Sequence, residues 1–149
     1  TRSIVDYLKE VLPSEMEPSE RSPEGLSVVR RIVSSELEER KQLERDLREL
    51  LGKEGVSPSD VIILCKAPRE ESVLKQIDSI NGVPLVSMGD RFDGRVKGLQ
   101  YTTIRVFKGL EAPIVFAVDL PSEGEESYAK TLYTSASRAQ LLLYLYHRK

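Results

Sequence analysis

A run of residues in the last third of the chain combines side chains that bind phosphates and sugars. Thr103 offers a hydroxyl group to a phosphate oxygen, and Lys108 offers a positive charge. Gly109 carries no Cβ atom and lets the backbone approach a ligand closely, and Glu111 can accept hydrogen bonds from ribose hydroxyls. An apolar run at 113–120 follows and is predicted to be a strand. Because ligands bind outside the carboxyl ends of strands in open α/β sheets, a loop at such a strand end would suit these contacts.

A second candidate is Arg138, which ends the sequence Tyr-Thr-Ser-Ala-Ser-Arg. A guanidinium group can neutralise the charge that builds on a transferred γ-phosphoryl group, provided that a well-packed element holds it rigidly. Tyr128, Leu132 and Ala136 recur at four-residue spacing, so residues 127–139 are predicted to form a helix that docks on a sheet. Arg138 would then project away from the docked face.

These two segments, in this order, resemble the two C-terminal signature motifs of the UvrD/Rep-like superfamily 1 helicases. Members typically carry Thr-x-His-x-x-Lys-Gly-Leu-Glu and, downstream, Tyr-Val-Ala-Leu-Thr-Arg-Ala. This chain has Thr-Ile-Arg-Val-Phe-Lys-Gly-Leu-Glu at 103–111 and Tyr-Thr-Ser-Ala-Ser-Arg-Ala at 133–139. The first segment continues as Ala-Pro, and the stretch before it has no room for the large helical insertion of UvrD and Rep. The chain is therefore similar to a compact branch of the family, which writes this motif Phe-Lys-Gly-Leu-Glu-Ala-Pro.

The resemblance implies the second, C-terminal RecA-like motor domain of an ATP-dependent DNA helicase or translocase. It places Thr103, Arg105 and Lys108 against single-stranded DNA. The family's usual histidine is Arg105 here, and arginine also binds phosphate and stacks on bases. The start of the chain, Thr1-Arg2-Ser3, is similar to the tail of another family motif, Asn-x-Arg-Ser/Asn-Thr. We therefore expect residues 1–149 to be a single domain cut from a longer protein.

On the nucleotide side, the resemblance assigns Gly109, Glu111 and Tyr133 to ATP binding and makes Arg138 the arginine finger. The chain contains no G-x-x-x-x-G-K-[ST] phosphate loop of its own and no acidic magnesium motif in a strand context. ATP and its Mg²⁺ would therefore be held mainly by an N-terminal RecA-like lobe that this chain lacks. The fragment alone is predicted not to hydrolyse ATP.

Apolar patterns that alternate between strand and helix periods predict the fold class. Strands are predicted at 26–33, 61–65, 83–88, 99–106, 113–120 and 141–146, and helices at 4–12, 35–51, 68–80 and 127–139. Continuous apolar runs such as 61–65 are typical of strands covered on both faces. The prediction is an α/β domain with an open, mostly parallel sheet, and the resemblance makes it RecA-like, of the P-loop NTPase type, with helices on both faces.

The charge composition limits how the chain could bind nucleic acid. The formal net charge of −2 argues against a uniformly basic nucleic-acid binder, so any DNA contact needs a local patch. The stretch 91–108 is locally basic and rich in glycine, which suits either a track for a phosphate backbone or a solvated loop.

No apolar run is long enough to cross a bilayer and no signal peptide is present, so a cytoplasmic location is expected. The single cysteine, Cys65, is predicted to be a buried strand residue.

Two other interpretations remain open from the sequence. The Arg105 substitution and the polar Thr134-Ser135-Ala136-Ser137, in place of the usual Val-Ala-Leu-Thr, also suit a non-catalytic lobe that binds nucleic acid or protein without cycling. An unrelated open-sheet enzyme domain with chance motif similarity is the third interpretation.

Overall fold

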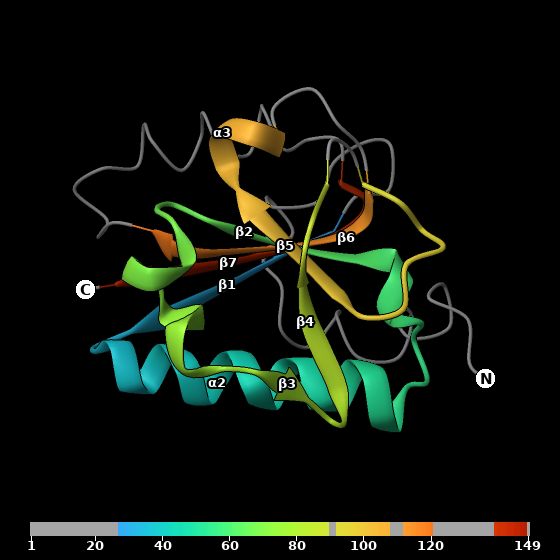
Figure 1. Cartoon of the computed structure of the whole chain (residues 1–149). Helices are drawn as coiled ribbons and strands as arrows, with labels where there is room; N and C mark the ends of the chain where they lie inside the picture. Colours follow the sequence, from blue (N-terminus) through green and yellow to red (C-terminus); the bar gives the residue numbers. More distant parts are fainter. Residues whose placement is uncertain (1–26, 90–91, 108–111, 121–138, 149) are drawn as a thin grey trace.

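The computed structural model describes residues 27–89, 92–107, 112–120 and 139–148 (Figure 1). Seven strands form one sheet in the order β1-β7-β6-β2-β5-β4-β3. In chain order they are β1 (Ser27–Val33), β2 (Val61–Cys65), β3 (Ser79–Ile80), β4 (Val83–Ser87), β5 (Leu99–Thr103), β6 (Ala112–Leu120) and β7 (Ala139–Arg148). The helical elements are α2 (Glu36–Arg48), its π-helical extension η3 (Glu49–Lys53), the 3-10 turns η4 (Pro58–Asp60), η5 (Arg69–Glu71) and η6 (Val73–Gln76), and the short helix α3 (Ile104–Phe107).

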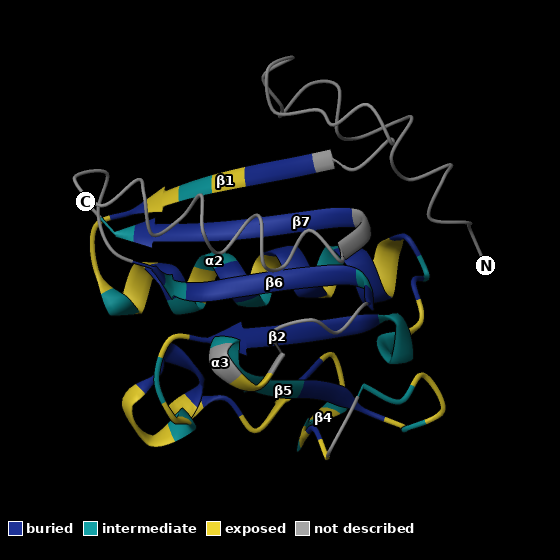
Figure 2. Cartoon of the chain, turned by 90° about the horizontal axis from the view of Figure 1, so that it is seen from above, coloured by how far each residue is buried: buried dark blue, intermediate teal, exposed yellow. Residues whose placement is uncertain are grey.

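In the spatial order of the sheet, each of the six strands β1, β7, β6, β2, β5 and β4 runs parallel to its neighbours among them. The last strand, β3, pairs antiparallel with β4. Figure 2, seen from above, shows that the central strands β7, β6 and β2 are almost wholly buried. Parallel strands covered on both faces read as continuous apolar runs, which is why β2 and β6 are apolar nearly throughout. The predicted α/β class with a mostly parallel sheet is confirmed.

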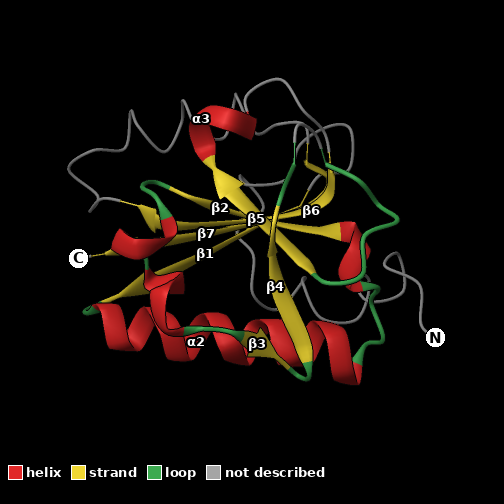
Figure 3. Ribbon diagram, in the orientation of Figure 1, coloured by secondary structure: helices red, strands yellow, loops and turns green. Residues whose placement is uncertain are grey.

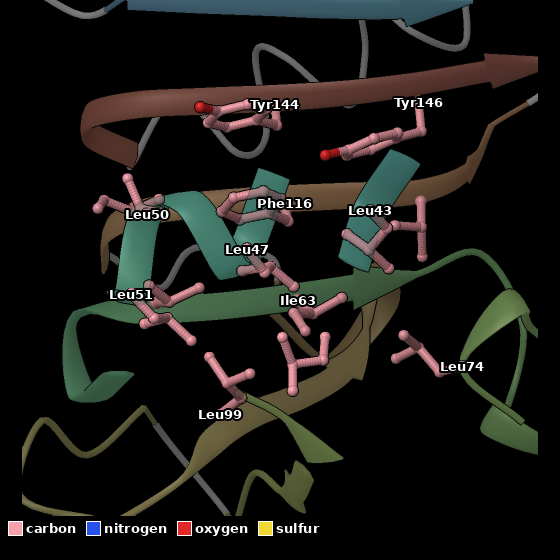
Figure 4. Close-up of a cluster of buried hydrophobic side chains, with 14 of the residues drawn as sticks. Leu43, Leu47, Leu50, Leu51, Ile63, Leu74, Leu99, Phe116, Tyr144 and Tyr146 are labelled. Carbon is pink, nitrogen blue, oxygen red and sulfur yellow. The ribbon is translucent and has the colours of Figure 1, made fainter. Parts of the chain in front are cut away.

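Helices cover both faces of the sheet. Helix α2 lies under one face, and α3 lies on the other (Figure 3). On the α2 side, Leu43 and Leu47 pack against Phe116 and Tyr144, whose rings stack with centroids 4.3 Å apart (Figure 4). On the opposite side, Ile104 of α3 packs against a second apolar cluster that includes residues of β2, β6 and β7. Alternation along each strand therefore supplies two cores.

A serine cap begins α2, and a glycine follows the end of its helical extension. Ser35 is the N-cap, and its side-chain oxygen accepts a hydrogen bond from the Glu38 amide at 3.1 Å. The helical run passes through Gly52 and stops before Gly55, whose φ of +69° suits glycine. A buried carboxylate, Asp46, anchors the helix to the sheet: Arg31 of β1 donates two 3.1 Å hydrogen bonds to it, and Tyr146 of β7 donates one at 2.7 Å.

The predicted helix at 68–80 does not form. Two 3-10 turns and the short strand β3 replace it, although all four apolar residues of the predicted helical face are buried, namely Val73, Leu74, Ile77 and Ile80. Ser72 has extended backbone angles, and its hydroxyl caps the Leu74 amide, which separates the two turns.

The predicted strand at 99–106 ends early, at Thr103. Thr103 pairs with Cys65, the last residue of β2, so the chain beyond it has no neighbouring strand on that side. β7 is longer than the predicted 141–146, because pairing with β6 and β1 extends it from 139 to 148. The predicted helix at 4–12 and residues 127–138 of the predicted helix at 127–139 lie outside the described residues. The last residue of the second helix, Ala139, instead begins β7, where it pairs with Ala112.

Candidate functional site

Of the predicted site residues, Thr103 is described in most detail. It is the last residue of β5, its side chain is half-buried, and its register partner is Cys65 at the end of β2. Thr103 therefore lies at the carboxyl edge of the parallel sheet, where ligand contacts are expected in open α/β folds. Arg105 lies in α3, which begins immediately after β5, and only its backbone is described. Lys108, Gly109, Glu111, Tyr133 and Arg138 lie outside the described residues.

The register of the sheet shows that the first motif joins opposite edges. Thr103 is level with Cys65 of β2, and the preceding residue, Leu64, pairs with Ala117 of β6. Ala112 follows Glu111 in the chain and begins β6, five residues before Ala117. It therefore lies roughly 17 Å nearer the amino edge, the end of the sheet at which the parallel strands begin. The segment from Thr103 to Ala112 therefore leads from the carboxyl edge back to the amino edge.

The second motif leads into the same amino edge. Ala139, the residue after Arg138, begins β7, and its register partner in β6 is Ala112. The residues that directly follow Glu111 and Arg138 are thus paired with each other on neighbouring parallel strands. The sequence places these two motifs more than twenty residues apart, and the β6–β7 pairing is what brings their ends to one level.

The described cations of the locally basic stretch 91–108 lie on both sides of β5 along the chain. Arg95 and Lys97 precede β5 at the amino edge, whereas Arg105 follows β5 at the carboxyl edge. The five residues of β5 lie between them and span roughly 17 Å. Among the described residues, Arg95 and Lys97 are thus separated from the Arg105 backbone by the length of β5.

Next to Thr103, the loop after β2 is organised by Arg69. Its guanidinium group donates to the carbonyl oxygens of Leu74 and Ile77, at 3.3 and 2.6 Å, and lies 5.2 Å from the centroid of the Tyr101 ring. Tyr101 also packs against the core cluster on the α2 face. Tyr101 therefore has a structural role, because its ring packs against the core and contacts Arg69, and we do not assign it to stacking on a nucleic-acid base.

A charged cluster that the sequence did not indicate closes the carboxyl edge. Glu39 of α2 is fully buried and accepts hydrogen bonds from the Asp119 amide at 2.7 Å and from Arg148 Nε at 2.9 Å. The Asp119 carboxylate in turn accepts hydrogen bonds from the Ser72 hydroxyl at 2.6 Å and the Val73 amide at 2.9 Å. Asp119 has a φ of +63°, an unusual value for a residue other than glycine. The cluster joins α2, the loop after β2, and the ends of β6 and β7.

Burial dominates the electrostatics of this edge. Desolvation raises the pKa of the Glu39 carboxyl above its ordinary value, while the Asp119 amide and the Arg148 guanidinium act in the opposite direction. Burial also raises the pKa of the Cys65 thiol to about 12, so this cysteine stays protonated and unreactive at neutral pH. The predicted buried position of Cys65 is confirmed.

The described part of the chain holds no group of three or more His, Cys, Asp or Glu residues suited to a metal ion. Within the same residues, no helix is long and apolar enough to cross a membrane.

Residues 98–146 match the family model described as UvrD-like helicase C-terminal domain. The matched span contains β5, α3, β6, all of β7 but its last two residues, and every residue predicted for the site. No curated protein matches the chain significantly. The match supports a UvrD-like C-terminal domain in this part of the chain, and the seven-stranded, mostly parallel sheet is consistent with the RecA-like fold of such domains. A domain of this kind implies a lobe of a helicase motor and an interaction with nucleic acid.

Proposed function

We propose that this chain is the C-terminal motor lobe of an ATP-dependent DNA helicase or translocase, from the compact branch of the UvrD-like proteins. ATP and Mg²⁺ are held mainly by an N-terminal RecA-like lobe of the same protein. This chain contributes the arginine finger, Arg138, and contacts to the single strand. The family match over residues 98–146 carries the proposal, because that span includes both motifs.

The strand register supports a shared nucleotide site for the two motifs. Glu111 and Arg138 precede Ala112 and Ala139, which are register partners on adjacent strands. Consecutive Cα atoms lie about 3.8 Å apart, so both motif ends join the sheet at one level of the amino edge. In the proposal Gly109 and Glu111 contact the ribose and phosphates, Tyr133 lies on the same side, and Arg138 neutralises charge on the γ-phosphoryl group.

The single strand is proposed to run past the other edge. Thr103, which is half-buried, ends β5 at the carboxyl edge, and α3, which contains Arg105, begins there. Lys108 follows α3 in the chain. The segment between Thr103 and Ala112 thus links the strand side to the nucleotide side. A change in the γ-phosphate contacts would move this one segment and so alter the grip on the strand, which is what a motor requires.

The test is ATP hydrolysis stimulated by single-stranded DNA, measured in the protein that carries both lobes. Arg138→Ala is expected to lower the stimulated rate by at least about a hundredfold, as loss of an arginine finger does. Arg48→Ala, which removes an exposed arginine at the end of α2, is the matched control and should leave the rate unchanged. A silent Arg138→Ala variant would overturn the assignment of the finger.

A second variant separates the two edges. Arg105→Ala is expected to weaken binding to an oligo-dT strand about tenfold and to lower the slope of log affinity against log salt by about 0.7, the value for one phosphate contact to a single strand. Its ATP hydrolysis without DNA should match wild type. If the protein binds the strand but hydrolyses no ATP, the non-catalytic binding lobe is the correct function, and the departures at Arg105 and at residues 134–137 explain it.

A further inference from the structure

A groove opens at the amino edge of the sheet, on the side away from Thr103. Its volume is about 390 Å³, and it lies between three segments, 57–59 before β2, 82–84 at the start of β4, and 94–98 before β5. This volume is within the range of roughly 300–1,000 Å³ that is usual for binding sites in proteins. Because β2, β5 and β4 are adjacent parallel strands, their leading segments meet along one line.

Close backbone contacts fix the shape of the groove. A Cβ atom at Gly98 would lie 2.6 Å from Val86 Cγ2 and 3.0 Å from the Pro84 carbonyl oxygen. The φ of Gly98 is also +142°, so only glycine fits at this position. Gly94 lies over the backbone of Ser59, where a Cβ atom would be 3.7 Å from the carbonyl oxygen. On the third side, Asn81 and Gly82 form the tight β3–β4 turn with positive φ at both positions. The groove is therefore preformed and needs little ordering when a ligand binds.

The lining combines an apolar floor with hydroxyls and cations. Proline and valine side chains from all three segments supply the apolar surface, namely Pro58, Val83, Pro84 and Val96. The hydroxyls of Ser57 and Ser59 lie 2.8 Å apart on one wall. Arg95 is 89% exposed and forms an ion pair with Asp93 at 3.2 Å. Lys97 is exposed and forms no ion pair within the described residues.

We propose that this groove is a docking site for an extended acidic peptide of a partner protein. Apolar side chains of the peptide lie on the proline and valine floor, and its carboxylates meet Lys97 and the outer face of Arg95. Peptide amides and carbonyls bind the two serine hydroxyls. This site lies on a different surface from the strand contacts proposed at Thr103, and it does not depend on the motor function.

A nucleic acid fits the groove less well than a peptide. A phosphate backbone is bound by several cations, whereas this groove has two, and one of them is shared with Asp93. Single-strand binding without sequence preference also uses aromatic side chains for stacking, and no described residue that lines the groove is aromatic.

The experiment measures binding of a fluorescein-labelled peptide of eight residues that alternates Glu and Leu, in the protein that carries this chain. Saturable binding by wild type is expected. The charge-reversed variant Arg95→Glu/Lys97→Glu should weaken it at least about tenfold, which corresponds to roughly 1.4 kcal/mol. Gly94→Leu should weaken it similarly by filling the groove, because Gly94 does not have positive φ and accepts a side chain without backbone strain.

The controls separate the groove from charge in general. Lys41→Glu/Arg45→Glu reverses two exposed charges on α2 and should leave the affinity within about twofold of wild type. A peptide with Gln in place of Glu should bind at least about tenfold more weakly. Equal affinity of the groove variants and wild type would overturn the proposal. So would an oligo-dT strand that displaces the peptide from wild type, because that result would make the groove a nucleic-acid site.

Discussion

At the carboxyl edge of the sheet, Glu39, Ser72, Asp119 and Arg148 from four separate segments satisfy one another's hydrogen bonds. At the amino edge, glycine, proline and serine segments leave a groove of about 390 Å³, and its cations face solvent. The first edge is held together around the fully buried carboxyl group of Glu39, and the second includes a close contact at Gly98 that only glycine permits. One parallel sheet thus has a closed edge and an open edge.

This difference shows where the molecule can respond to ligands. Glu39 is fully buried, so separating it from the Asp119 amide and Arg148 would leave a buried carboxyl group without hydrogen-bond partners. The carboxyl edge should therefore move as one body with α2 and the ends of β6 and β7. The segment after Thr103 leaves this rigid edge and returns to the amino edge at Ala112. A lobe that couples a nucleotide to a strand needs this combination of a fixed frame and one connecting segment.

The largest expected effect comes from breaking the carboxyl edge at Glu39. Glu39→Ala leaves the partly buried Asp119 amide without its acceptor and removes one of the two carboxylate partners of Arg148. We expect a loss of about 3 kcal/mol in the free energy of unfolding, from the unsatisfied amide and the cavity left by the fully buried side chain. Urea denaturation gives the value.

Glu44→Ala is the matched control, since Glu44 also lies on α2 but pairs with Arg40 and Arg48 at the surface. It should cost no more than about 0.5 kcal/mol. If the two variants were equally stable, the buried cluster would not be what holds the carboxyl edge closed.

At the open edge, the substitution of Gly98 is expected to cost less stability than that of Glu39, and for a different reason. Gly98→Ala forces a Cβ atom to within 2.6 Å of Val86 Cγ2 while φ stays at +142°, so we expect a loss of about 2 kcal/mol in the free energy of unfolding. Gly94→Ala is the comparison, because its Cβ atom would make only an ordinary 3.7 Å contact. It should be neutral within about 0.5 kcal/mol. A Gly98→Ala variant as stable as wild type would mean that the wall of the groove adjusts freely.

Local patterns in the sequence predicted the frame of this fold correctly. The apolar runs predicted as strands at 61–65 and 113–120 and the helix predicted at 35–51 rest on local signals, and they correspond to β2, β6 and α2 in the structure. The leucine stripe of α2 is likewise buried against the sheet. Such features depend on neighbours within a few residues, which is why a single sequence is enough to find them.

Features that depend on distant residues were not predictable in this way. The helix expected at 68–80 is broken near Val73, whose amide donates a hydrogen bond to the Asp119 carboxylate, 46 positions away in the chain. The carboxyl-edge cluster joins Glu39 to Arg148 across 109 positions. For the nucleotide and strand sites, the resemblance supplied the residues, and only Thr103 among them has a described side chain.

The smallest expected effect is a pH dependence of the closed edge. Burial raises the folded-state pKa of Glu39 above its ordinary 4.5, so the folded protein holds this proton more tightly than the unfolded chain does. Its contribution to stability is therefore fully present below pH 4.5 and is lost as the pH rises through the folded-state pKa. Glu39→Gln removes this titration, because the amide carries no ionisable proton. The free energy of unfolding of wild type minus that of Glu39→Gln should fall between pH 4 and pH 8 in urea denaturation. A difference that rises with pH would mean that the hydrogen bonds from the Asp119 amide and Arg148 outweigh burial in setting the Glu39 pKa.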